Sequence, residues 1–124
     1  MRELLCAALG GGCGAALRYW ISAWAARRWT AFPYGTLLVN VLGCFLIGFF
    51  MAVSEQRTGL PPLLRPLLVA GFLGGLTTFS TFSYESLQML LSGNFGQALA
   101  NLAVNLLFCL AATSAGLALG RYVA

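Results

Sequence analysis

The stretch GFLGGLTTFSTFS, residues 71–83, decides how this chain folds. It lies near the middle of a hydrophobic segment, about Leu67 to Leu91, that is long enough to cross a bilayer as a helix of about 20 residues. Glycines lower its helix propensity, and threonine and serine hydroxyls can replace lost backbone partners. Non-helical backbone at that depth is tolerated where it is buried in protein or faces a water-filled cavity. The stretch therefore predicts a break near residues 74–80 that forms a functional site.

A plainer interpretation of the same residues stays open. Glycines can kink a transmembrane helix, and hydroxyls can bond back to their own helical turn without forming any site.

Three other hydrophobic segments of spanning length accompany this one, at about Leu4 to Ala26, Gly35 to Val53 and Gln97 to Leu119. The spacing Gly10-x-x-x-Gly14 in the first suits close helix contact. The first 20 residues also have the pattern of a secretory signal, but Arg18 lies inside the continuing hydrophobic segment. The sequence predicts an all-α membrane protein of one domain, residues 1–124, with four transmembrane helices and a broken third helix.

The composition points to the bilayer as the solvent. Of 124 residues, 60% are hydrophobic and 8% charged, against about 25% charged in soluble proteins. The basic residues are all arginine and form no cluster of four or more on one face, which argues against nucleic acid as a partner. The four cysteines lack a C-x-x-C pair and the chain lacks histidine, so we expect packing cysteines without a zinc or redox motif.

Four helices place both termini on one side of the membrane. The arginines expected on that side are Arg2, Arg57, Arg65 and Arg121, and those on the other are Arg27 and Arg28. The positive-inside rule reads such asymmetry as orientation, and here the asymmetry is slight. Insertion in both directions is therefore compatible with the sequence.

Aromatic and polar side chains within the spans suggest an ion pathway. Phe79 and Phe82 are three residues apart and would share a helix face. Most such pairs are core, yet ring edges carry partial positive charge and can face an anion. A stripe on the fourth helix and a pair on the second add polar groups, although interhelical hydrogen bonding explains any one of them. These residues are Asn101, Asn105, Cys109, Thr113, Thr36 and Asn40.

Arg18 and Glu85 are the ionisable residues within the predicted spans, which makes both functional hypotheses. Arg18 would snorkel to an interface or give an aqueous vestibule positive potential. Glu85 would repel an anion if it lined the path while ionised, so we expect it to be paired, protonated or turned away.

These residues resemble the bacterial fluoride channels of the Fluc family, also called CrcB proteins. The resemblance covers essentially the whole chain and is strongest in the run GGLTTFSTFS. It rests on GGCGA-x-x-RY at residues 11–19, PYGTL-x-VN at residues 33–40, and residues 71–83 followed by Glu85.

The resemblance implies an antiparallel, dual-topology homodimer with two fluoride pores in the bacterial plasma (inner) membrane. A structural sodium ion would be held at the centre by the backbone carbonyls of Gly74 and Thr77, and Arg18 would lie toward the vestibule. Family members commonly have a hydroxyl where this chain has Cys109, and a thiol is a weaker donor, so either fluoride passage at Cys109 is altered or the neighbouring Ser114 contributes. The fluoride pathway would comprise Phe79, Phe82, Asn40, Thr113, Asn105 and Cys109, with Ser80 and Thr81 of the hydroxyl run.

The activity implied is passive export of cytoplasmic fluoride, which gives fluoride resistance. The sequence contains no nucleotide motif, acid/base pair or nucleophile constellation, so we expect no enzyme. Two alternatives are a small proton-coupled multidrug exporter, which needs a membrane-embedded acid such as Glu85, and a non-transporting membrane scaffold.

Overall fold

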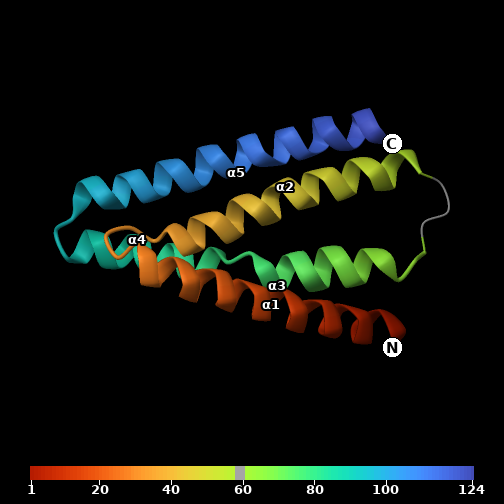
Figure 1. Ribbon diagram of the computed structural model, residues 1–124, viewed down its shortest axis with the longest axis horizontal. Coiled ribbons are helices and arrows are strands. Elements are labelled where there is room, and N and C mark those ends of the chain that lie inside the picture. Colours follow the sequence, from red (N-terminus) through yellow and green to blue (C-terminus); the bar gives the residue numbers. More distant parts are fainter. Residues whose placement is uncertain (58–60) are drawn as a thin grey trace.

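The computed structural model describes residues 1–57 and 61–124, and its regular elements in these ranges are all helical. Four segments are long and apolar enough to cross a membrane, the third consisting of three consecutive elements (Figure 1). The prediction of four transmembrane helices with a broken third is confirmed. The elements are α1 (Arg2–Arg28), α2 (Tyr34–Gln56), η1 (Pro66–Leu73), α3 (Gly74–Leu76), α4 (Phe79–Leu91) and α5 (Phe95–Val123).

The observed boundaries differ modestly from those predicted by hydropathy. The spanning helices extend up to four residues beyond the predicted apolar segments, because backbone hydrogen bonds continue into polar ends such as residues 54–56. The break is narrower than the predicted range of 74–80. It is confined to Thr77 and Thr78, since Gly74–Leu76 remain helical.

The first part of the third span is a π-helix, η1, which the sequence analysis did not predict. Pro66 begins it, and at its end the N–H of Gly74 donates to the carbonyls of Gly71 and Val69. Single π-type turns within helices are frequent at functional sites. Here the short helix α3 separates the π-helix from the break.

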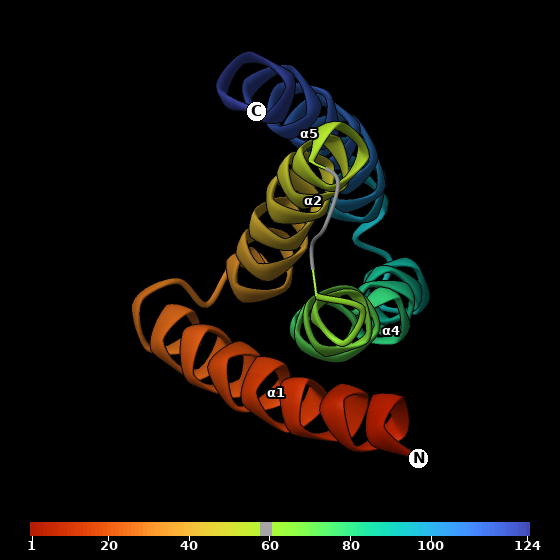
Figure 2. The same cartoon turned by 90° about the vertical axis from the view of Figure 1, so that its right-hand side faces the viewer.

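Glycines allow the helix pairs to approach closely. A Cβ added to Gly10 or Gly14 would collide with carbonyls of the third span, so the predicted close contact of this pair is confirmed. Gly48 of α2 and Gly116 of α5 meet backbone of the facing helix in the same way. Figure 2 shows the result end-on, with α1 beside the third span and α5 beside α2.

The helices α2 and α5 run in the same direction, opposite to α1 and the third span, and both termini lie at one end of the molecule (Figure 1). Contacts between α2 and α5 keep one register along their length. Asn40 bonds Asn105 near the start of the pair and Gln56 bonds the backbone of Arg121 near its end, and both pairs are 65 residues apart in sequence.

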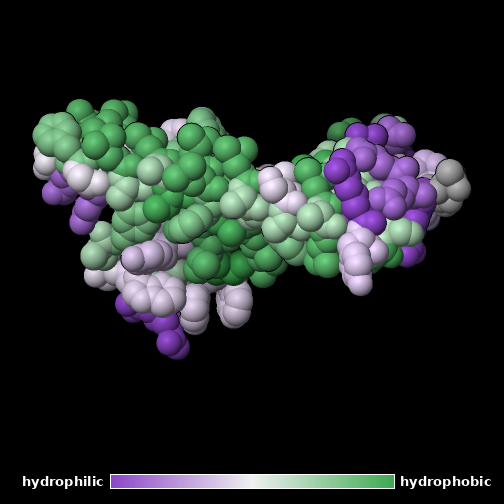
Figure 3. Space-filling model, turned by 90° about the horizontal axis from the view of Figure 1, so that it is seen from above, coloured by the Kyte–Doolittle hydropathy of each residue, from purple (hydrophilic) through white to green (hydrophobic). Residues whose placement is uncertain are grey.

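The outer surface is apolar over most of its length. Figure 3 shows green hydrophobic atoms across the middle of one face and hydrophilic atoms toward the ends. Many leucine and aromatic side chains are exposed, whereas few large ones, such as Leu76 and Val39, are fully buried. Exposed apolar side chains around spanning helices are what lipid contact requires. The chain is a multi-pass membrane protein.

Candidate functional site

The break forms where the backbone of the third span becomes extended. Thr77 has φ −81° and ψ 157°, and Thr78 has φ −150° and ψ 106°. The N–H of Thr77 still donates to the carbonyl of Leu73 at 3.0 Å, as in a helix. The N–H of Thr78 does not continue that pattern, so the carbonyl of Gly74 loses its helical donor.

The side chain of Asn40 on α2 satisfies the backbone of the break. Its Oδ1 accepts from the N–H of Thr78 at 2.8 Å, and its Nδ2 donates to the carbonyl of Thr78 at 3.2 Å. Thr78 also caps α4, because its Oγ1 accepts from the N–H of Thr81 at 3.1 Å. Asn40 therefore supplies, from a neighbouring helix, hydrogen bonds to both the N–H and the carbonyl of Thr78.

A chain of buried amides continues from Asn40. Its Nδ2 donates also to Oδ1 of Asn105 at 3.3 Å, and Nδ2 of Asn105 donates to Oδ1 of Asn101 at 2.9 Å. Nδ2 of Asn101 then donates to Oγ of Ser86 at 2.9 Å. Asn40 and Asn105 use both amide hydrogens on protein acceptors. The amide chain, defined by Asn40, Asn105, Asn101 and Ser86, thus ties α2, α5 and α4 together.

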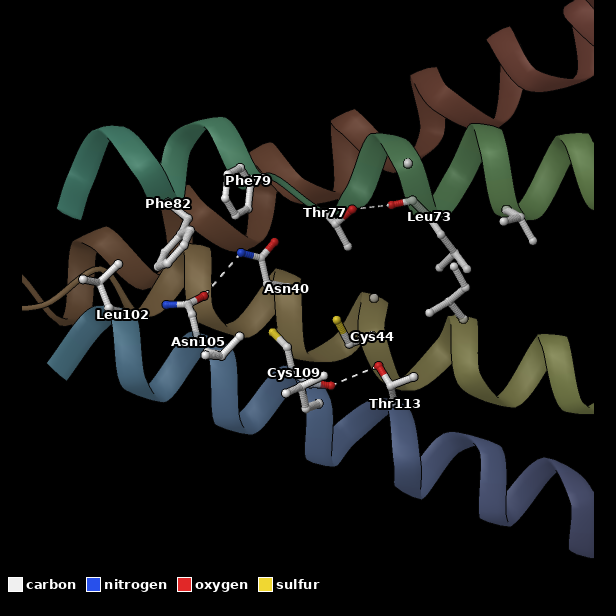
Figure 4. Close-up of a pocket in the computed structure, with 16 residues that line it drawn as sticks. Asn40, Cys44, Leu73, Thr77, Phe79, Phe82, Leu102, Asn105, Cys109 and Thr113 are labelled. Carbon is white, nitrogen blue, oxygen red and sulfur yellow. Dashed lines mark hydrogen bonds between the residues drawn. The ribbon is translucent and has the colours of Figure 1, made fainter. Parts of the chain in front are cut away.

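A cavity of about 610 Å³ lies beside the break, between α2, α5 and the third span (Figure 4). Its wall is mostly apolar. It gathers most of the predicted pathway residues, which come from three segments distant in sequence: Asn40, Phe79, Phe82, Asn105, Cys109 and Thr113. Gly74 and Thr77, the predicted carbonyl ligands, line it as well.

Two aromatic rings form the wall nearest the break. The centroids of Phe79 and Phe82 are 5.5 Å apart and their planes are inclined by 61°, an edge-on arrangement. Phe79 is 77% exposed in the single chain, and Phe82 is half-buried. The predicted sharing of one helix face is confirmed, and ring edges are available to a ligand in the cavity.

Some of the predicted site residues lie elsewhere. Ser80 and Thr81 are exposed and are not among the residues that line the cavity. Their hydroxyls lie near Oγ1 of Thr78, which donates to Oγ1 of Thr81 at 2.8 Å. Thr113 does line the cavity, but its hydroxyl donates to the carbonyl of Cys109 in its own helix at 3.0 Å.

The two ionisable residues of the spans have defined partners. Arg18 is half-buried, and its guanidinium donates to the carbonyl of Thr77 at 3.2 Å. One oxygen of Glu85 accepts from Oγ1 of Thr36 at 2.9 Å, and the carboxyl group lies outside the cavity wall. We expected Glu85 to be paired, protonated or turned away, and the bond from Thr36 agrees with the first of these for one oxygen, whereas the other oxygen is buried without a hydrogen-bond partner among the described residues. Arg18 places positive charge directly at the break.

Sequence reasoning missed the importance of Thr78 and Ser86. A cap signal was present, because a threonine precedes the helical run that starts at Phe79. Ser86 had no such signal. Its hydroxyl also donates to the carbonyl of Phe82 at 2.8 Å, an ordinary bond within one helix that says nothing about Asn101.

Comparison with known proteins identifies the family. A family model described as "CrcB-like protein, Camphor Resistance (CrcB)" matches residues 5–117. Proteins named "Fluoride-specific ion channel FluC" are similar over nearly the whole chain. The one from Chloroflexus aurantiacus is 46% identical over 98% of both chains, and the one from Geobacter metallireducens is 46% identical over 99% of this chain and 100% of its own. The one from Anaeromyxobacter dehalogenans is 46% identical over 100% of this chain and 99% of its own. The chain belongs to the CrcB family.

Proposed function

We propose that this protein is a fluoride-selective channel through which cytoplasmic fluoride leaves passively. The observation that carries the proposal is the cavity at the helix break, walled by the ring edges of Phe79 and Phe82. The relatives named as fluoride-specific channels identify the ion. A membrane channel of this family is not an enzyme.

The chemistry of the wall suits conduction of an anion. Ring edges and thiols offer weak positive potential, and weak contacts let an ion leave as readily as it enters. Among the described residues, none that lines the cavity carries a charge that would trap fluoride. Arg18 acts from behind the break, where its bond to Thr77 raises the potential without touching the cavity.

The direction of flow follows from acid–base chemistry. Hydrogen fluoride crosses membranes as a neutral weak acid and dissociates in the less acidic cytoplasm, which traps the anion. A selective channel in the bacterial inner membrane lets fluoride leave down its electrochemical gradient. Conduction of this kind confers fluoride resistance.

A homodimer would complete the pore. The cavity carries amide, hydroxyl and backbone groups, and in a single chain its open side would expose them to lipid, which is costly. Gly74 and Phe79 are exposed on this side. A second copy of the chain in antiparallel orientation would cover the face and form a matching pore.

The distribution of charge supports insertion in both directions. Figure 1 shows which helix ends lie on the side that holds both termini. The arginines at those helix ends are Arg2, Arg57, Arg65 and Arg121, and those at the opposite end of α1 are Arg27 and Arg28. Topology reporters fused to the C-terminus should be found on both sides of the membrane, and cross-linking should give dimers. A single orientation would contradict the dual topology.

Sodium would occupy the centre of this dimer, held by the carbonyls of Gly74 and Thr77. Hard cations prefer such oxygens. The residues fit: Gly74 has lost its helical donor, and Thr77 retains one lone pair beside its bond from Arg18. The ion would neutralise converging carbonyl dipoles and stabilise the assembly. Replacing sodium by N-methylglucamine should lower dimer stability, and an unchanged dimer would contradict this site.

The test of the function is ion release from liposomes. Purified protein should release fluoride but little chloride when a potassium ionophore clamps the voltage, as read with ion-selective electrodes. Protein-free liposomes are the control. Equal release of both ions, or release of neither, would overturn the proposal.

A further inference from the structure

Two thiols face one another across the α2–α5 pair. Cys44 and Cys109 are 65 residues apart, the separation that also joins Asn40 to Asn105 one helical turn earlier. Gly48 meets the carbonyl of Thr113 one turn later, at the same separation. Because hydrogen bonding on one side and backbone contact on the other fix the register, the thiols are held opposite each other. Figure 4 shows both cysteine side chains among those that line the cavity, one from each helix.

Both thiols are free, half-buried and part of the cavity wall. Apolar side chains line the same cavity, including Ile47, Leu106 and Leu110. The other two cysteines, Cys6 and Cys13, lie on α1 and do not line the cavity. The chain thus has one facing dithiol within reach of whatever enters the cavity.

We propose that Cys44 and Cys109 form a two-thiolate site for a soft divalent cation of the mercuric type. Each thiol releases its proton to water, and two sulfur–metal bonds form to one Hg²⁺. The complex is neutral, since two thiolate charges cancel the charge of the ion, and no electron is transferred. Soft sulfur ligands select soft metals, and the apolar wall favours a product without net charge.

Other cations fit this site less well. Zinc in protein sites almost always takes four ligands, and no cluster of three or more histidine, cysteine or acidic residues occurs in residues 1–57 and 61–124. A monovalent soft ion would leave one uncancelled negative charge on two thiolates among apolar side chains, which is costly. A two-coordinate divalent ion avoids both problems.

Metal bound to Cys44 and Cys109 should reduce conduction of fluoride. This step rests on the proposed fluoride channel. The metal replaces both thiol hydrogens, so the wall loses two weak donors where fluoride would pass. Bound metal also occupies space between α2 and α5 at the cavity. Fluoride release should therefore fall when the dithiol is loaded.

The binding test needs no ion flux. A Cys6→Ala/Cys13→Ala background leaves only the facing pair, and Cys44→Ala or Cys109→Ala in that background leaves a single thiol. Reduced protein, freed of reductant, is loaded with mercuric chloride and washed with excess glutathione, a monothiol competitor. The paired background should retain one mercury per chain by elemental analysis, and each single-thiol variant less than a fifth of that. Equal retention in all three, or none in the pair, would overturn the site.

The flux test uses the same three proteins in liposomes, each compared with and without mercuric chloride. Fluoride release should fall at least fivefold in the paired background and less than twofold in the single-thiol variants. Mercury retention without any fall in release would overturn the coupling to conduction. If no protein releases fluoride even before metal is added, the channel proposal fails, whereas the retention result still decides the metal site.

Discussion

The amide chain and the cavity wall lie side by side on the same helices, yet they treat their polar groups differently. In the amide chain, Asn40 and Asn105 use both amide hydrogens on protein acceptors. One turn further along α5, Cys109 presents a free thiol to the cavity, and Thr113 bonds only within its own helix. The first arrangement holds the break together across three helices, whereas the hydrogen bond of Thr113 joins no second helix.

The polar residues spaced four apart on α5 therefore fall into two groups with different roles, the amide chain and the cavity wall. A buried polar group whose partners are removed is costly, so the amide chain should respond to substitution with a loss of stability. A group that bonds only within its own helix contributes little to assembly, so the cavity wall should respond with altered flux. Substitutions in the two regions therefore test whether the amide chain and the cavity wall have different roles.

The largest effect is expected for Asn40→Leu. It leaves the N–H and carbonyl of Thr78 and Oδ1 of Asn105 without their partner in a buried place. At about 1–3 kcal/mol for each unsatisfied group, the variant should lose at least about 3 kcal/mol of unfolding free energy. Unfolding in mixed detergent micelles measures this. A loss below about 1 kcal/mol would show that Asn40 does not support the break.

Thr113→Val should have a smaller effect, and the effect should be on fluoride release and not on stability. The hydroxyl bonds only to the carbonyl of Cys109, so unfolding free energy should change by less than about 0.5 kcal/mol. Fluoride release should fall about threefold, because the hydroxyl can turn from the carbonyl of Cys109 to donate to the passing ion at a net gain of about 0.7 kcal/mol, which valine cannot do. The same micelle and liposome assays apply. A large loss of stability with normal flux would reverse the assignment of roles.

Cys109→Ser should have the smallest effect. A hydroxyl is a better donor than a thiol, so fluoride release should rise about twofold if the ion contacts this position. Chloride release in the same liposomes is the control and should stay low. Identical fluoride release rates for Cys109→Ser and the unsubstituted protein would show that the ion does not contact Cys109.

Much of this molecule could be predicted from its sequence. The four spans follow from runs of apolar residues, and the break follows from glycines and hydroxyls at a depth where lipid offers no hydrogen bonds. The gathering of Phe79, Phe82 and Asn40 at one cavity also agrees with prediction. These features depend on local composition and spacing, which a single sequence contains.

The rest depends on how the helices meet. Asn101 and Cys109 belong to the same run of residues spaced four apart, so they look equivalent in the sequence. Contacts with other helices distinguish them: Asn101 bonds Ser86 of α4, whereas Cys109 lines the cavity. The same applies to Ser80 and Thr81, whose hydroxyls lie outside the cavity wall. The parallel register of α2 and α5 likewise appears only once both helices are placed.

Fluoride release by a Phe79→Ile/Phe82→Ile double variant measures whether the cavity wall carries the anion. Isoleucine preserves bulk but has no ring edge. We expect fluoride release to fall at least tenfold, while the dimer and the unfolding midpoint stay as in the unsubstituted protein. Unchanged fluoride release from an intact dimer would show that the ring edges of the cavity wall do not carry the anion.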